Sequence, residues 1–245
     1  MSSSPMRIQA GFTQDASWQP LGLIGAPDPT FYATFFDDFM GYQTGRFTNT
    51  NTGNGSEAPA DGAGGRVLFT TNTSTPAAGD IASIQVNSAC VQYSATKKLA
   101  FLTRLQLADV TNPAMLTGVI QKTTTPFTVT DGVYFSKATG TTNITVNVMA
   151  SSVVIATTTL TGLLTNATDV DLGFTYDGRG SLLIFAGAGL LGQKPNQNTA
   201  ILGPVARLTP ASFPTALLTP TLSLQSGTAT SKTMNADLLY ASVER

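Results

Sequence analysis

The sequence contains no histidine and only one cysteine in 245 residues. Histidine is the commonest general base near neutral pH and the commonest metal ligand, so its absence disfavours most Ser-, Cys- and metal-dependent catalytic sites. Cys90 alone can form neither an intramolecular disulfide nor a multi-cysteine metal site. We therefore expect no cofactor and no metal, and a fold that is stabilised by packing and assembly.

Charged residues are also scarce. They make up 11% of the chain, against about 25% in typical soluble proteins, and 13 basic and 14 acidic side chains leave a net charge of -1. This balance provides no basic face for a nucleic acid and no polybasic patch for a membrane. No signal-peptide pattern opens the chain, and no later apolar run reaches the roughly eighteen residues of a membrane span. These absences predict a protein made and kept in the cytoplasm that binds neither nucleic acid nor membrane.

The dominant pattern is an alternation of apolar and polar residues with a period of two. Clear runs lie at 99–107, 143–148 and 169–176, with shorter ones at 67–70, 81–86, 133–136, 153–160, 182–185, 216–224 and 238–243. Each run is typical of a β-strand, and Gly, Pro, Asn and Asp rather than helical segments separate the runs. About a dozen short strands in a chain of this length predict one all-β domain, an antiparallel β-sandwich of jelly-roll type.

The first 33 residues do not follow this pattern. Prolines at 5, 20, 27 and 29 favour an extended course between isolated large apolar side chains. We interpret residues 1–33 as an extended amino-terminal docking arm and residues 34–245 as the jelly-roll sandwich. The candidate partner-binding anchors are the apolar residues Phe12, Trp18, Leu23, Ile24, Phe31 and Tyr32. The alternative is a first edge strand with loops that pack on the chain's own body.

Four motifs in this body occur in a familiar order. They are Phe36–Gly41 (FDDFMG), Asp131–Phe135 (DGVYF), Phe174–Gly178 (FTYDG) leading into Ser181–Phe185, and Ala236–Tyr240 (ADLLY). In order and spacing they resemble the concanavalin-A-like, lectin-type jelly-roll proteins that occur as structural proteins of tailed bacteriophage particles. The resemblance covers residues 34–245, and it implies the same two-layered fold.

The resemblance also implies a function. We expect a virion structural protein, most simply a capsid decoration (cement) protein that binds the major capsid protein lattice on the outer surface of the head and stabilises it. Its partners would be the major capsid protein and other copies of itself, and assembly in the host cytoplasm would need neither a signal peptide nor disulfides. The alternative is a carbohydrate-binding or adhesion module of the particle, on the head surface or in the tail, that binds surface glycans.

Glycoside hydrolases share the lectin-type sandwich, and their reaction needs two carboxyl groups that face the scissile bond. The only glutamates are Glu57, in a glycine-rich segment, and Glu244 at the carboxyl end. The pair of glutamates on one strand that resembles the catalytic pattern of those hydrolases is absent, and we do not expect an enzyme. Asp169 and Asp171 share one strand face, which we interpret as a solvated polar surface opposite apolar residues.

Three further features receive structural interpretations. The segment 53–65 lacks the Gly-Lys-Ser or Gly-Lys-Thr ending of a phosphate loop and is predicted to be a flexible loop. Cys90 is predicted to be a small buried hydrophobe. The pair Asp37–Asp38 is interpreted as structural, at a strand end beside Phe36 and Phe39, which are expected to enter the core. A calcium ion bound by these aspartates is the alternative.

Overall fold

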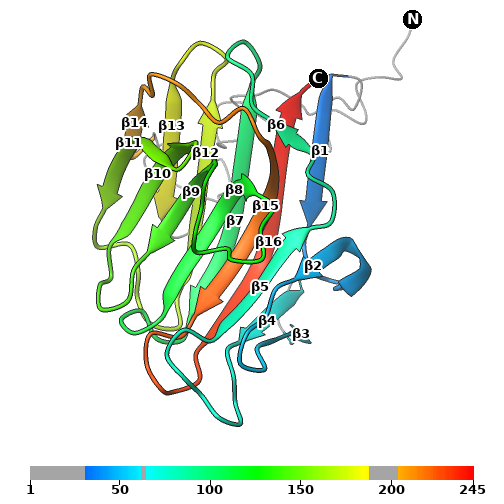
Figure 1. Cartoon of the computed structure of the whole chain (residues 1–245), viewed down its shortest axis with the longest axis vertical. Coiled ribbons are helices and arrows are strands. Elements are labelled where there is room, and N and C mark those ends of the chain that lie inside the picture. The colour runs from blue at the N-terminus through cyan, green and yellow to red at the C-terminus, as the bar shows by residue number, and fades with distance from the viewer. Residues whose placement is uncertain (1–30, 62–64, 188–203) are drawn as a thin grey trace, which may run out of the picture.

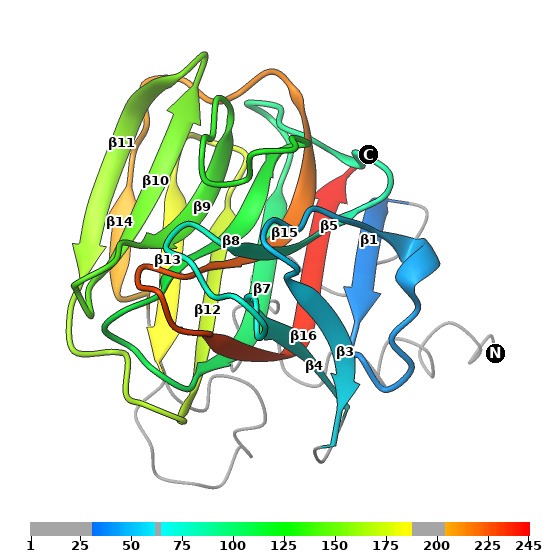
Figure 2. The same cartoon turned by 60° about the horizontal axis from the view of Figure 1, so that its bottom comes forward.

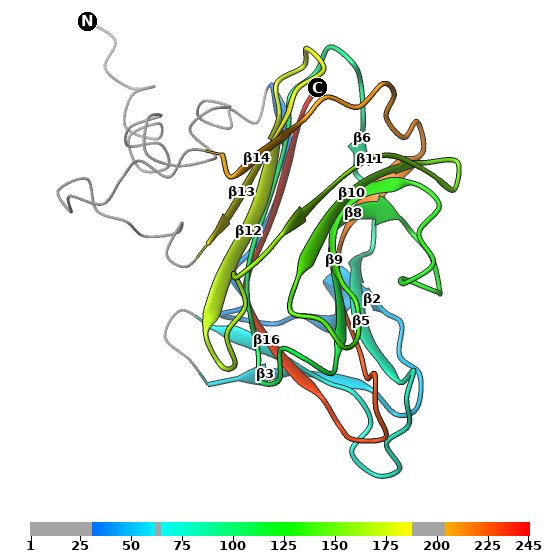
Figure 3. The ribbon, with the colours of Figure 1, turned by 90° about the vertical axis from the view of Figure 1, so that its left-hand side faces the viewer.

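The structure, a computed structural model, describes residues 31–61, 65–187 and 204–245, and these residues form an antiparallel β-sandwich (Figure 1). The described strands make two eight-stranded sheets, and the helical structure in these ranges is one 3-10 turn, η2 (Thr44–Arg46). Figure 3 shows the two sheets from the side as separate layers that face each other. The predicted all-β jelly-roll sandwich is confirmed. Within the described ranges, no helix has the length and apolar character needed to cross a membrane.

Sheet A contains the first and last strands of the described chain. In order across the sheet its strands are β14 (Ala206–Leu208), β13 (Leu182–Gly187), β12 (Asp169–Tyr176), β7 (Leu99–Leu107), β16 (Thr233–Glu244), β4 (Arg66–Thr70) and β3 (Ser56–Ala60), and β1 (Tyr32–Asp37) also pairs with β16. The long strand β16 pairs with β4 along its first half and with β1 along its second half (Figure 2). Since β1 pairs with β16 alone among the described strands, it is an edge strand.

Sheet B forms the second layer. Its strands, in order, are β11 (Val153–Leu160), β10 (Ile144–Ala150), β9 (Gly132–Lys137), β8 (Ala114–Gln121), β15 (Leu217–Gln225), β5 (Ile81–Val86) and β2 (Phe47–Asn49), and β6 (Val91–Gln92) also pairs with β15. The two-residue strand β6 begins the crossing to sheet A, because the chain continues from it towards β7.

The core lies between the sheets and follows the period-two pattern. In β10, for example, Ile144, Val146 and Val148 are buried in the main core, while the residues between them are only partly buried. Phe101 of β7 stacks on Phe174 of β12 with ring centroids 5.4 Å apart. Such alternation places one face of each strand in the core.

Some strands are buried on both faces, and each sheet therefore carries a second, smaller apolar cluster. On the outer face of sheet A the cluster consists of Tyr32, Ala100, Leu102 and Tyr240, with Leu238 against it. On sheet B it consists of Leu116, Ile120 and Tyr134, with Phe127, Val129 and Met149 against it. Both faces of β7 are therefore buried, with Phe101 and Leu105 in the main core and Ala100 and Leu102 in the outer cluster.

The ten predicted runs all overlap strands of the structure, but six of the described strands, β1, β2, β3, β6, β8 and β14, lie outside those runs. β3 lies inside the glycine-rich segment 53–65, so the prediction of a loop throughout that segment is wrong. β8 lacks a period-two pattern because it is buried on both faces. Gly118 in β8 lies against the backbone of β9, and an added Cβ would lie 2.4 Å from the carbonyl oxygen of Val133. This close approach explains a glycine in the middle of a strand.

Candidate functional site

The edge strand β1 is surrounded by exposed apolar side chains. Phe31 is 64% exposed just before it, Phe36 is 48% exposed within it, and Met40 is 74% exposed just after it. Phe36 faces outward opposite Tyr240 of β16, so the expectation that Phe36 enters the core is wrong. Phe39, by contrast, is buried in the core as expected. We call Phe31, Phe36 and Met40 the β1 surface.

The structure places two of the six predicted anchors. Phe31 is exposed in the β1 surface, whereas Tyr32 is buried as the first residue of β1 and belongs to the outer cluster of sheet A. Tyr32 and Ala33 thus lie in a strand of the sandwich. The other four predicted anchors, Phe12, Trp18, Leu23 and Ile24, lie outside the described residues.

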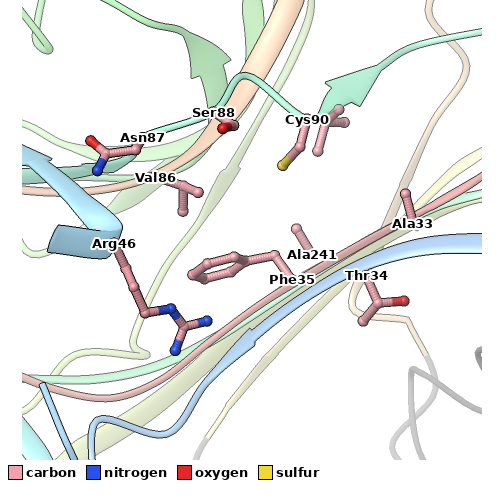
Figure 4. Close-up of a pocket in the computed structure, with 10 residues that line it drawn as sticks. Ala33, Thr34, Phe35, Arg46, Val86, Asn87, Ser88, Cys90 and Ala241 are labelled. Atoms are coloured by element: carbon pink, nitrogen blue, oxygen red, sulfur yellow. The ribbon is translucent and has the colours of Figure 1, made fainter. Parts of the chain in front are cut away.

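A cleft opens between the two sheets beside β1 (Figure 4). It has a volume of about 380 Å³, and its lining residues include Ala33 and Phe35 from β1, Val86 from β5 and Ala241 from β16. Cys90 lies at its mouth, and Figure 4 shows the sulfur directed into the space above the Phe35 ring. Cys90 is exposed, so the prediction of a buried cysteine is wrong. Its surroundings desolvate the thiol and raise its pKa, which disfavours the nucleophilic thiolate.

Arg46, in η2, closes one end of this cleft. Its Nη1 lies 2.7 Å from Oδ2 of Asp37, whose side chain is almost fully buried, and its Nη2 donates to the carbonyl oxygen of Phe36 at 3.1 Å. The guanidinium also lies over the Phe35 ring, 5.1 Å from the centroid. One arginine thus fixes the end of β1, which agrees with a structural role for Asp37.

An ionic cluster occupies the outer face of sheet A. Arg104 donates from Nε to Oδ1 of Asp171 at 2.7 Å and from Nη2 to Oδ2 at 3.1 Å. Arg66 binds Asp169 at 2.8 Å, and Arg104 also lies 3.7 Å from Asp237. The side chain of Asp171 is only 1% exposed, so the predicted solvated surface is wrong. Arg104 occupies the position of β7 that pairs with Asp171 of β12, whereas Arg66 comes from β4, which is separated from β12 by β7 and β16.

The strands of sheet B carry no carboxylate side chain. None of its eight strands contains an aspartate or a glutamate, and Lys137 is their only charged residue. Both glutamates of the chain lie in sheet A, Glu57 in β3 and Glu244 in β16. Burial raises the pKa of Glu57, although hydrogen bonds from Asn51 and Asn49 oppose the shift. A raised pKa suits a general acid, but glycoside hydrolysis needs a second carboxyl group beside the first.

The described residues contain no group of three or more histidine, cysteine, aspartate or glutamate side chains arranged to hold a metal ion. The Asp37 carboxylate is instead used by Arg46 and by the backbone N–H of Phe39. These contacts account for the aspartate at the end of β1 as a structural element.

A second pocket lies at the end of the sandwich where β12 ends and β15 begins. It has a volume of about 530 Å³, and Tyr93, Tyr176, Phe213 and Arg179 are among its lining residues. The three rings come from separate segments of the chain and contact one another. No periodic pattern marks this pocket in the sequence, because Tyr93 and Phe213 lie in irregular connections. We call it the aromatic pocket.

No family model and no curated protein sequence matches this chain, but solved structures do. A protein of unknown function from Shewanella oneidensis MR-1 superposes with a TM-score of 0.61 at 14% identity, covering 100% of this chain and 95% of that one. The Bacillus licheniformis β-glucanase gives 0.58 at 12% identity, over 85% of this chain and 97% of that one. Basic winged bean lectin gives 0.55 at 9% identity, over 86% and 98%.

This is the concanavalin-A-like fold. Identities this low show the shared architecture alone, and the fold occurs both in glucanases and in lectins. The concanavalin-A-like sandwich therefore does not decide by itself between catalysis and binding. The function must therefore be inferred from the side chains that this chain places on the fold.

Proposed function

We propose that this chain is a structural protein of a bacteriophage particle, a decoration or cement protein that binds the major capsid protein lattice on the outside of the head. Two things support the proposal: the sequence resemblance to phage structural proteins, and the β1 surface. The observation that carries a binding role is the grouping of Phe31, Phe36 and Met40, all exposed, around one edge strand. Large apolar side chains that are exposed along the edge of a sheet are typical of a surface that another protein covers.

The proposed docking arm would lead directly into this surface. Phe31 immediately precedes β1, and the remaining anchors of the arm, Phe12, Trp18, Leu23 and Ile24, precede it in the sequence. A neighbour that holds both the arm and the β1 surface would gain effective concentration for the second contact. A stable contact of this kind should bury at least about 1,000 Å².

Capsid stabilisation then follows from mass action. A protein that binds the assembled lattice but not the free subunits stabilises the lattice by RT ln(1 + [L]/Kd) per site. No catalytic group is needed for this work. The strands of sheet B, which lack carboxylates, and a chain without histidine are compatible with a protein that acts only by binding.

The test uses heads assembled from the major capsid protein of the same particle and emptied of this chain. The full chain, a variant lacking residues 1–29, the double variant Phe36→Ser with Met40→Ser, and the control Val153→Ser are added back, and occupancy is measured by sedimentation. Val153 is also exposed, but it lies on sheet B, away from β1.

We expect saturable binding of the full chain and of the control, and at least tenfold weaker binding of the other two variants. Circular dichroism checks that each variant is folded. Equal occupancy by all four proteins would rule out the arm and the β1 surface as the attachment site, and no binding by any of them would overturn capsid decoration.

A second candidate is a carbohydrate-binding module of the particle. The aromatic pocket favours it, because aromatic faces bind the apolar faces of sugar rings and pockets of this size hold small ligands. A glycan array probed with the full chain tests this function. Selective signals that disappear in Phe213→Ala support it, and an array without any signal contradicts it.

A further inference from the structure

The aromatic pocket is built from three rings with fixed geometry. Tyr93 and Phe213 stack with centroids 3.8 Å apart and planes at 10°, and Tyr176 lies 4.8 Å from each of them in a tilted arrangement. Because Tyr93 and Phe213 already lie against each other, a ligand ring has no slot between them. A ligand can reach the rings only from the side that lines the pocket.

Tyr176 also holds the rim of the pocket in place. Its hydroxyl donates to the carbonyl oxygen of Ala95 at 2.8 Å and accepts from the backbone N–H of Gly180 at 2.9 Å. It therefore joins the segment after β6 to the turn between β12 and β13. A rim fixed in this way needs little reorganisation when a ligand binds.

The backbone N–H groups of residues 179 to 181, in the turn that carries Arg179, already have hydrogen-bond acceptors within the protein. Oδ1 of Asp177 accepts from the backbone N–H of Arg179 at 2.7 Å and of Ser181 at 3.0 Å, and Tyr176 takes the N–H of Gly180. A phosphate-binding loop presents such amides to its ligand. Here all three are already used inside the turn.

The donor that this turn does present is the Arg179 side chain. Arg179 is exposed, lines the pocket, and makes no ion pair or side-chain hydrogen bond among the described residues. Its planar guanidinium matches a carboxylate in a two-point hydrogen bond. Ser212 and Thr215, whose side chains carry hydroxyl groups, also line the pocket. The lining thus combines aromatic rings, hydroxyls and one guanidinium.

The electrostatics of this end of the sandwich favour an anionic ligand. Strand register places the segment before β7, the end of β16 and the start of β13 at one end, together with Lys97, Lys98, Arg207 and Arg245. The acidic groups in those segments are Asp177, which is used by the turn, and Glu244, whose carboxylate accepts from the backbone N–H of Lys98. A basic end of this kind on a chain of nearly zero net charge attracts anions.

We propose that the aromatic pocket binds a saccharide that carries a carboxylate, a sugar acid of the uronic or sialic type, with its ring against Phe213 and its carboxylate on Arg179. This proposal rests on carbohydrate binding, the second candidate function, and it does not depend on attachment to the capsid. The hydroxyls of Ser212 and Thr215 favour a saccharide over an acidic peptide, because a sugar ring offers several hydroxyls beside its apolar face.

The test is isothermal titration of the full chain with three probes: a trimer of galacturonic acid, a neutral trimer of galactose, and an acidic peptide of six glutamates. Arg179→Gln removes the carboxylate contact, and Phe213→Leu removes the ring. Lys122→Gln is the matched control, since it removes one positive charge at the same end but outside the pocket. Arg179 is exposed and makes no ion pair or side-chain hydrogen bond among the described residues, so Arg179→Gln should keep the fold.

We expect the acidic trimer to bind at least tenfold more tightly than the neutral trimer. Arg179→Gln and Phe213→Leu should each weaken binding about tenfold, and Lys122→Gln should change it less than twofold. Equal binding of both trimers, or equal losses in Arg179→Gln and Lys122→Gln, would overturn the assigned ligand class while leaving carbohydrate binding in place. Binding of the peptide alone would replace the saccharide by a protein partner, and no binding of any probe would refute the site. Head occupancy by Arg179→Gln separates all these results from a failure of capsid attachment.

Discussion

Arg104 on β7 and Asp171 on β12 form a two-point ion pair across sheet A, with N–O distances of 2.7 and 3.1 Å. The carboxylate is almost completely shielded from water. The hydrogen bonds that Arg104 donates to Asp171, and the negative charge of Asp171, raise the pKa of Arg104, although burial lowers it. Breaking a buried pair is more costly than never having had it, because the remaining charge loses its partner.

We therefore expect Asp171→Asn to lower the free energy of unfolding by about 3 kcal/mol, measured by urea denaturation. Asp61→Asn is the control, because Asp61 is exposed and a surface substitution should change the free energy by less than about 0.5 kcal/mol. The double variant Arg104→Met with Asp171→Leu should recover most of the loss. Equal stability of Asp171→Asn and the control would show that the pair does not hold β7 and β12 together.

The contacts of Asp109 predict that the folded protein loses stability in acid. Burial by itself raises the pKa of this carboxyl, but hydrogen bonds from Lys232 and Asn112 and from the backbone N–H of Thr111 outweigh it, and the pKa lies well below the usual value. The folded state thus holds this proton less tightly than the unfolded state, so the contribution is present above about pH 4 and is lost as the pH falls below it. The Tm difference between the wild type and Asp109→Asn should narrow below pH 4, whereas a difference that is constant from pH 7 to pH 2.5 would contradict this role.

The close backbone approach at Gly118 predicts that a larger residue does not fit at the centre of sheet B. An added Cβ would lie 2.4 Å from the carbonyl oxygen of Val133 and 2.5 Å from Cα of Tyr134, both backbone atoms that cannot move without disturbing the pairing of β8 with β9. We expect Gly118→Ala to lower the free energy of unfolding by more than about 2 kcal/mol. Gly45→Ala, where no atom lies within 4 Å, should have little effect. Thermal unfolding of the two variants compares them directly, and similar Tm values would be inconsistent with the close approach.

The two tyrosines of the aromatic pocket should respond oppositely to loss of their hydroxyls. Among the described residues the buried hydroxyl of Tyr93 has no hydrogen-bond partner of good geometry, and burial, together with the neighbouring Tyr176 hydroxyl, raises its pKa. The hydroxyl of Tyr176 makes two hydrogen bonds. Tyr93→Phe should raise the free energy of unfolding by about 1 kcal/mol, and Tyr176→Phe should lower it by about 1 to 2 kcal/mol. Chemical denaturation of both variants measures this contrast, and a loss in Tyr93→Phe as large as that in Tyr176→Phe would show that Tyr93 is satisfied.

Strands could be predicted from the sequence where only one face of the strand is buried. β10 keeps strict alternation because one face meets the core and the other is polar, and its position was predicted. β8 was not predicted because Leu116 and Ile120 bury its outer face as well, which removes the alternation. The strand β3 was not predicted, because glycines surround it and its residues, most of which are exposed, form no apolar pattern.

The candidate sites were less accessible, because their residues come together only through the fold. The exposure of Phe36 depends on the side of β1 that faces outward, and its neighbours Asp37 and Phe39 gave no information on this. Tyr93 and Phe213 lie 120 positions apart by their residue numbers and meet because the irregular segments that carry them lie at the same end of the sandwich. Spacing within one sequence contains no record of such long-range contacts.

The most direct test of the account is photo-crosslinking on assembled heads. The crosslinking amino acid p-benzoylphenylalanine is placed at position 36 or 40, in the β1 surface. For comparison it is placed at position 153 on sheet B, where the exposure of Val153 lies between those of Phe36 and Met40. We predict crosslinks to the major capsid protein from positions 36 and 40 and none from position 153. Crosslinks to the capsid from position 153 alone, or none from any position on heads that have bound the chain, would contradict attachment through the β1 surface.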